Sequence, residues 1–160
     1  MRSTAFRRFY RADWAWRLLC LEAALYLTIA SILVKCVPFR YWKRFLGTMQ
    51  QCSQGAPCSG LASGGDGQLA NVGKAIDMSA RVLPWQSVCL PKAVAAKWML
   101  TRRGYPVTVY FGSKRSTEPG QPPDFHAWSV VHGVGITGVP EAEHFEPMVR
   151  YFSHKSPNGS

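Results

Sequence analysis

The chain has 160 residues, of which 47% are hydrophobic and 18% charged, and its formal net charge is +10 at pH 7. This composition excludes a disordered chain and is sufficient for one domain with a modest core. The positive charge favours an anionic partner, such as nucleic acid, acidic lipid or an acidic polypeptide, or else a solvated basic surface.

The first predicted element is an apolar helix over about residues 10–35, interrupted by the charge of Glu22. Its apolar part, residues 18–34, is at the lower limit of length for a membrane span, and no signal-peptide cleavage site follows it. We expect a helix that is buried or faces a protein partner, in a cytoplasmic protein. Interfacial membrane contact is the main alternative and a true span a further one. Basic residues flank the segment, which favours membrane or protein contact over DNA: Arg2, Arg7, Arg8, Arg11 and Arg17 before it, and Lys35, Arg40, Lys43 and Arg44 around its end.

Three further segments precede the centre of the chain. Pro38 ends the first helix, and residues 39–49 are predicted as a short second helix with an apolar face. Residues 50–67 are rich in glycine, which predicts a loop. A third helix is predicted at 69–82, where apolar residues recur at helical spacing, and Asp66 is a candidate cap.

The second half of the chain predicts one more helix and then strands. The helix begins at Cys89 and ends near Arg103, and strand candidates follow at 107–111, 126–131 and 134–137. Helices followed by a small antiparallel meander indicate an α+β domain. We divide the chain into a helical extension with a linker (1–67), the α+β domain (68–152) and a tail (153–160).

The five cysteines are Cys20, Cys36, Cys52, Cys58 and Cys89, and their spacing is not that of metal ligands. We therefore expect no metal and no other cofactor. Cys20 and Cys36 are predicted to be buried in the apolar helix. Cys52 and Cys58 could pair in the loop, although a cytoplasmic location would keep them reduced. No nucleic-acid-binding motif is present, so nucleic acid is not expected as a partner.

Cys89 at a helix start and His126 at the start of a strand form the candidate catalytic pair. The free N–H groups and the dipole of a helix N-terminus stabilise a thiolate, and an imidazole within hydrogen-bond reach can serve as its base. Taken alone, each residue is usually structural. Their order, a helix headed by Cys, a strand, and then a strand bearing His, is that of papain-like and transglutaminase-like cores. His132 is a rival base, but it is predicted to lie in a turn.

Longer motifs make a resemblance specific: Cys89-Leu90-Pro91, then Arg102-Arg103-Gly104-Tyr105-Pro106, then Phe125-His126-Ala127-Trp128. In this order they resemble the transglutaminase-like domain of lasso-peptide maturation proteases, over residues 18–148. The resemblance implies a transglutaminase-like (papain-like) cysteine protease core with an N-terminal helical extension. It also implies that Cys89 is the nucleophile and His126 the base.

The resemblance further implies a substrate and partners. Such an enzyme is a cysteine peptidase that cleaves the leader from a ribosomally made precursor peptide. A separate ATP-dependent cyclase then closes a macrolactam ring on the freed amine. Because no room for a recognition domain exists before residue 18, the chain resembles the split form of the family, which uses a separate leader-recognition protein.

One position departs from the family pattern. The family places an Asp, which orients the imidazole, where this chain has Gly138, and a Glu where it has Val130. The pair could work as a dyad without an orienting residue. Otherwise, the remaining candidates for orienting His126 are Asp124, Glu141, Glu143 and a backbone carbonyl.

Three other functions stay open. The same cysteine and histidine would serve a transglutaminase-like acyltransferase or amidase with another substrate. The absence of the family Asp would permit a non-catalytic scaffold in the biosynthetic complex. The basic residues around the apolar helix would suit a membrane-associated binding module.

Overall fold

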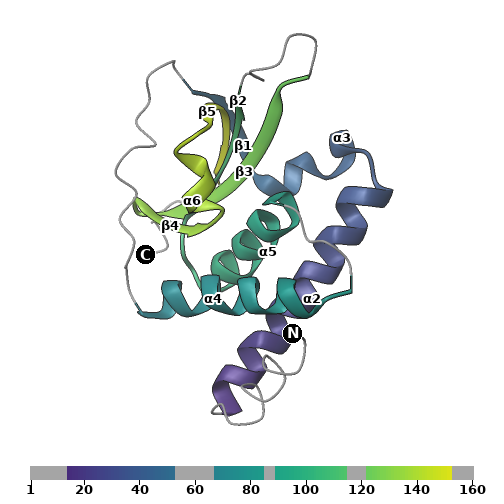
Figure 1. Ribbon diagram of the computed structural model, residues 1–160, viewed down its shortest axis with the longest axis vertical. Helices are drawn as coiled ribbons and strands as arrows, with labels where there is room; N and C mark the ends of the chain where they lie inside the picture. The colour runs from purple at the N-terminus through teal and green to yellow at the C-terminus, as the bar shows by residue number, and fades with distance from the viewer. Residues whose placement is uncertain (1–13, 53–66, 85–88, 115–121, 153–160) are drawn as a thin grey trace, which may run out of the picture.

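The computed structural model describes residues 14–52, 67–84, 89–114 and 122–152. Within these ranges, long helices pack beside an antiparallel sheet of five strands, as Figure 1 shows. The α+β class with an N-terminal helix is therefore confirmed. Helix α5 (Cys89–Arg102) lies directly against the sheet, while α2 (Trp14–Cys36) and α4 (Gly67–Val82) pack on α5 and on each other.

Helix α2 confirms the first predicted helix, and one side of it belongs to the core. Its buried residues are mostly small, so that α4 and α5 approach it closely: Cys20, Ala23, Leu27, Ala30 and Ser31. The hydroxyl of Ser79 on α4 donates a hydrogen bond of 3.0 Å to the Cys20 carbonyl. Cys36, predicted to be buried, is instead exposed, because it is the last residue of α2 and lies beyond this packed side.

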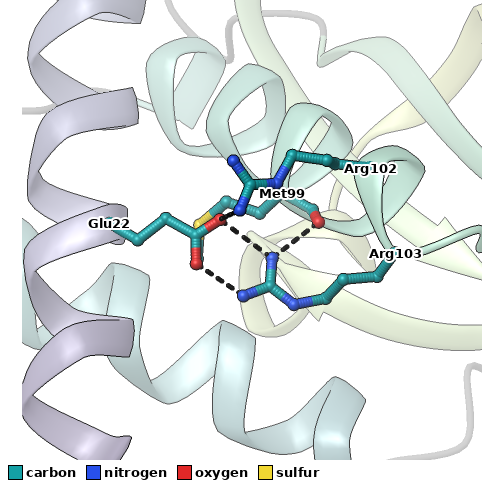
Figure 2. Close-up of polar contacts among 4 residues, drawn as sticks. All are labelled: Glu22, Met99, Arg102 and Arg103. Atoms are coloured by element: carbon teal, nitrogen blue, oxygen red, sulfur yellow. Dashed lines mark hydrogen bonds and ion pairs between the residues drawn. The ribbon is translucent and has the colours of Figure 1, made fainter.

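Glu22, the acidic residue of α2, links this helix to the C-terminal end of α5 (Figure 2). Its carboxylate accepts hydrogen bonds from both terminal nitrogens of the Arg103 guanidinium, one of them at 3.1 Å. Arg103 also donates to the Met99 carbonyl at 2.7 Å, and Arg102 lies 3.8 Å from the same carboxylate. The charge that interrupts the apolar segment is thus neutralised inside the fold.

The prediction of a helix over 39–49 is wrong in its second half. Helix α3 (Phe39–Trp42) and the 3₁₀ helix η1 (Lys43–Leu46) are followed by strand β1 (Thr48–Gln51). Gly47, with φ at 101°, turns the chain between them, and β1 then finds a partner far along the sequence. The predicted loop therefore begins only after Gln51. Its remainder, with Cys58 and Asp66, lies outside the described residues.

The third and fourth predicted helices and the three predicted strands are confirmed. The strands β2 (Val107–Lys114), β3 (Asp124–Val131) and β4 (Val134–Thr137) form an antiparallel meander. The prediction omitted the short helix α6 (Val139–Ala142) and strand β5 (Glu146–Phe152). Strand β5 pairs with both β1 and β2, which gives the order β1-β5-β2-β3-β4.

A proline explains why β5 is hard to recognise. A proline within a strand pattern argues against a strand, because proline donates no ladder hydrogen bond. Here Pro147 lies opposite Gly112, beside the point where the register between β2 and β5 shifts, so its missing N–H is tolerated at an irregularity.

The two faces of the sheet carry different side chains. Val109 on β2 and Ala127 on β3 contact Ala93 of α5 on one face. Trp128, the next residue of β3, packs with Ala142 of α6 on the other face. Because side chains alternate along a strand, this division decides where each candidate site residue of β3 lies.

Candidate active site

Cys89 is the first residue of α5 and is half-buried. It packs against the cluster of Ala93, Val109 and Ala127, so α5 holds it beside the middle of β2 and the first half of β3. Pro91 in the first turn is buried and has the fixed φ that suits a helix start. As the first residue of α5, Cys89 lies beside backbone N–H groups that have no partner within the helix.

His126 lies in the first half of β3, with its ring on the face of the sheet that bears Trp128. The imidazole stacks on the Trp128 ring at a centroid distance of 5.9 Å and an interplanar angle of 18°. On another side it contacts Phe145, with centroids 5.0 Å apart. The two aromatic rings confine the orientation of the imidazole.

A backbone carbonyl holds the imidazole at the position where the resembling family has Asp. Nε2 of His126 lies 2.8 Å from the Gly138 carbonyl oxygen. Since a carbonyl only accepts, Nε2 must carry the hydrogen, and Nδ1 is then the basic nitrogen of the neutral ring. None of Asp124, Glu141 and Glu143 hydrogen-bonds to His126 in the described part of the chain.

Gly138 also gives the imidazole its space. Its φ is 71°, which disfavours any residue with a side chain. A Cβ there would lie 2.9 Å from His126 Nε2 and 2.8 Å from the Ala127 carbonyl oxygen. The sequence revealed the missing Asp, but the carbonyl contact depends on a backbone conformation that only the fold defines.

Cys89 and His126 lie on two elements that pack together, α5 and β3, but their side chains lie on different faces of the sheet. Cys89 contacts the cluster that contains Ala127, the residue next to His126. The His126 ring lies among Trp128 and Phe145 on the other face, and no hydrogen bond joins it to Cys89 within the described residues. In the part of the chain that it describes, the structure therefore does not bring the two predicted catalytic side chains into contact.

The rival residues lie elsewhere. His132 has φ at 49° in the turn between β3 and β4, at the opposite end of β3 from His126. Among the other thiols, burial raises the pKa of Cys20 and of Cys52, which makes both of them poorer nucleophiles. A small cavity of about 270 Å³, lined in part by Thr108, Arg150 and Phe152, lies toward the same far end of the sheet.

Lys97 is a buried charged residue on the inner side of α5. It is 1% exposed, and its ammonium donates to the Val107 carbonyl at 3.1 Å, where β2 begins. Burial lowers the pKa of Lys97 to about 8. Lys97 lies two turns beyond Cys89, so it fixes α5 on the sheet without approaching the thiol.

Comparison with known proteins gives one family. Residues 33–150 match the model of a family described as the transglutaminase-like superfamily, and this match includes Cys89, His126 and Gly138. No curated protein and no solved structure matches the chain significantly. In the described residues, no group of three or more His, Cys, Asp or Glu side chains is arranged to hold a metal ion.

Proposed function

Because this chain belongs to the transglutaminase-like superfamily, we propose that it is a cysteine peptidase that removes the leader segment from a ribosomally made lasso-peptide precursor. The superfamily commonly contains cysteine peptidases and acyltransferases, so the family itself supports thiol-based acyl chemistry. The narrower substrate is supported by the motifs around Cys89 and His126 and by the order in which they occur.

The observation that carries the proposed roles is the hydrogen bond between His126 and the Gly138 carbonyl. It leaves Nδ1 as the basic nitrogen of the neutral ring, and in the proposed mechanism this nitrogen takes the proton of the Cys89 thiol. The thiolate then attacks the carbonyl carbon of the last leader residue. Backbone N–H groups at the start of α5 are in a position to stabilise the oxyanion.

The rest of the reaction follows from the same two groups. The tetrahedral intermediate collapses to a thioester on Cys89, and the protonated Nδ1 delivers its proton to the departing core amine. A water molecule, deprotonated by Nδ1, then hydrolyses the thioester and releases the leader with a new carboxylate. Throughout, the Gly138 carbonyl accepts from Nε2–H and supports the imidazolium, although a neutral carbonyl does so less strongly than a carboxylate would.

The test is leader cleavage followed by mass spectrometry, with the full-length protein, the precursor peptide and the recognition protein. Cys89→Ala and His126→Ala are each expected to reduce cleavage by about a thousandfold or more. The matched controls are Cys36→Ala, which removes an exposed thiol, and His144→Ala, which removes an exposed imidazole. Cleavage by Cys89→Ala at the wild-type rate would refute the mechanism, whereas the absence of cleavage by the wild-type protein would favour the scaffold.

The acyltransferase alternative shares the thioester and differs in the acceptor. Adding a primary amine to the reaction separates the two, because a transferase forms a leader amide whereas a peptidase forms mainly the free acid. If the leader amide were the main product, the reaction would be assigned as acyl transfer instead of hydrolysis. The proposed roles of Cys89 and His126 would stay the same.

A further inference from the structure

The outward side of α2 is a continuous stripe of large apolar side chains in contact with solvent. Six residues at intervals of three or four form this apolar stripe and are 44% to 72% exposed: Trp14, Leu18, Leu21, Leu25, Ile29 and Ile32. A helix of 23 residues is about 34 Å long, so the stripe is an extended surface. Contiguous apolar surfaces of this kind mark sites that bind a partner or a membrane.

Length and composition alone would allow α2 to cross a membrane, and α2 is the one helix in the described ranges for which this holds. Its packing argues against that arrangement. The side opposite the stripe forms part of the protein core, and Glu22 is paired with Arg103 on α5. A span would expose the apolar sides of α4 and α5 to water and break this pair. One side of α2 therefore packs against the rest of the protein, and the opposite side stays exposed to solvent.

The chain at the C-terminal end of the stripe is basic and aromatic. Lys35, Arg40, Lys43 and Arg44 are all exposed, and no ion pair joins them to an acidic residue in the part of the chain that the structure describes. Tyr41 and Phe45 are 53% and 61% exposed beside them. We name these six residues the basic-aromatic corner. No acidic residue occurs between positions 23 and 52.

The stripe and the corner belong to elements that follow one another along the chain. In Figure 1, α2 and α3 together form the right-hand border, with α3 continuing from the upper end of α2. Apolar side chains along one face of a helix, with cations and aromatic rings at its end, are the composition of helices that lie in the membrane interface. The cations match the negative charge of anionic headgroups.

We propose that α2 docks flat on an anionic lipid bilayer, with the apolar stripe among the acyl chains and the basic-aromatic corner among the headgroups. A second copy of the chain fits this surface less well. Basic residues flank the stripe at both ends, so parallel and antiparallel pairing of two α2 helices would each bring like charges together. Membrane docking of this kind is independent of the reaction at Cys89.

Vesicle flotation with the full-length protein tests the proposal. Binding is expected to vesicles of phosphatidylcholine with about 30 mol% phosphatidylserine, to be weak for phosphatidylcholine alone, and to fall as salt rises. Replacing both Leu21 and Leu25 by Gln should weaken binding about tenfold or more, since two buried apolar side chains are lost. Replacing Arg40, Lys43 and Arg44 by Gln should weaken it about fivefold per cation.

Matched controls come from exposed residues on other elements. Met148→Gln with Val82→Gln removes two apolar side chains that are 50% and 48% exposed, and Arg81→Gln removes an exposed cation. These variants should bind like the wild type, and circular dichroism should show that all variants are folded. Equal binding to neutral and anionic vesicles, or no loss in the Leu21 and Leu25 variant, would overturn the proposal. The proposal would also be overturned if the wild-type protein failed to bind vesicles and formed a dimer that the Leu21 and Leu25 variant does not form. In that case the apolar stripe would bind a second copy of the chain.

Discussion

The two ends of α5 differ in how completely they are tied to the rest of the protein. At the C-terminal end, Tyr105 N–H donates to the Leu100 carbonyl and Gly104 N–H to the Thr101 carbonyl, both at 3.0 Å, and Gly104 has φ at 89°. This is a Schellman motif, which satisfies the last carbonyls of the helix. Arg103 adds its contacts with Glu22 and with the Met99 carbonyl.

The N-terminal end of α5 carries the half-buried Cys89, whose neighbours are apolar. Lys92, in the first turn of α5, pairs with Asp77 of α4 at 3.1 Å, but both side chains are partly exposed and no hydrogen bond to Cys89 occurs in the described part of the chain. The two ends of α5 thus differ in role: one contributes stabilising contacts and the other bears the predicted nucleophile. The C-terminal end, which we call the closed end, is capped and paired, while the N-terminal end presents the half-buried thiol of Cys89.

The largest expected effect concerns Lys97, in the middle of α5 between the two ends. It is a change of the free energy of unfolding with pH, which reports whether water reaches the buried ammonium. Burial lowers the pKa of Lys97 from 10.5 to about 8. Below pH 8 both states are protonated, and the folded state bears the full cost of the buried ammonium. Between pH 8 and 10.5 the unfolded chain binds more protons, so the free energy of unfolding should rise with pH, by up to about 3 kcal/mol.

Lys97→Met isolates this effect, because other groups titrate identically in both proteins. Urea unfolding of both proteins from pH 7 to 10.5 should show the rise in the wild type and its absence in Lys97→Met. Parallel pH profiles would mean that the Lys97 ammonium is hydrated in the folded state.

The second prediction weakens the closed end of α5. Glu22→Gln keeps the side-chain shape but leaves the Arg103 guanidinium, 22% exposed, without its counter-charge. The expected loss in the free energy of unfolding is about 2 kcal/mol, with cleavage activity of the folded protein unchanged. Arg102→Gln is the matched control. This side chain is 69% exposed and 3.8 Å from the carboxylate, so its loss should cost less than about 0.5 kcal/mol.

The third prediction concerns the other member of the predicted catalytic pair, His126. Gly138→Ala places a Cβ 2.9 Å from Nε2 and should displace the imidazole, lowering kcat about tenfold, equivalent to about 1.4 kcal/mol. Gly133→Ala is the control, because Gly133 also has a positive φ, 78°, but its Cβ would meet nothing within 4 Å. Both variants should lose stability because of the positive φ, and Gly138→Ala should lose more in thermal unfolding because its Cβ also meets the Ala127 carbonyl oxygen at 2.8 Å. Equal activities would show that the position of the ring is not limiting.

The sequence allowed correct prediction of those helices and strands that have a clear local residue pattern. The helix from Cys89 has apolar periodicity and a glycine after its end, and it was placed to within a residue. Strand β2 was recognised from its β-branched and aromatic residues. Strands β1 and β5 were omitted because they stabilise each other across most of the chain, and neither has a local pattern that outweighs Gly47 or Pro147.

The candidate site shows the same division. Cys89 and His126 were identifiable from residue type and order, and their catalytic roles stay a prediction. The hydrogen bond from His126 to Gly138 depends on a left-handed backbone at Gly138 and on the β3–β4 pairing. Because a carbonyl belongs to every residue, no side-chain pattern could have indicated this one.

The position of β5 in the sheet has a consequence for biosynthesis. Strand β1 has no partner other than β5 within the described sheet, and β5 also covers the outer edge of β2. During synthesis on the ribosome, β1 therefore has no strand to pair with until residues 146–152 have emerged. Helices α2, α4 and α5 can associate before that point. Such long-range pairing is slow and leaves strand edges open to aggregation, so ribosome-bound intermediates of this protein should depend on chaperones until synthesis reaches the last strand.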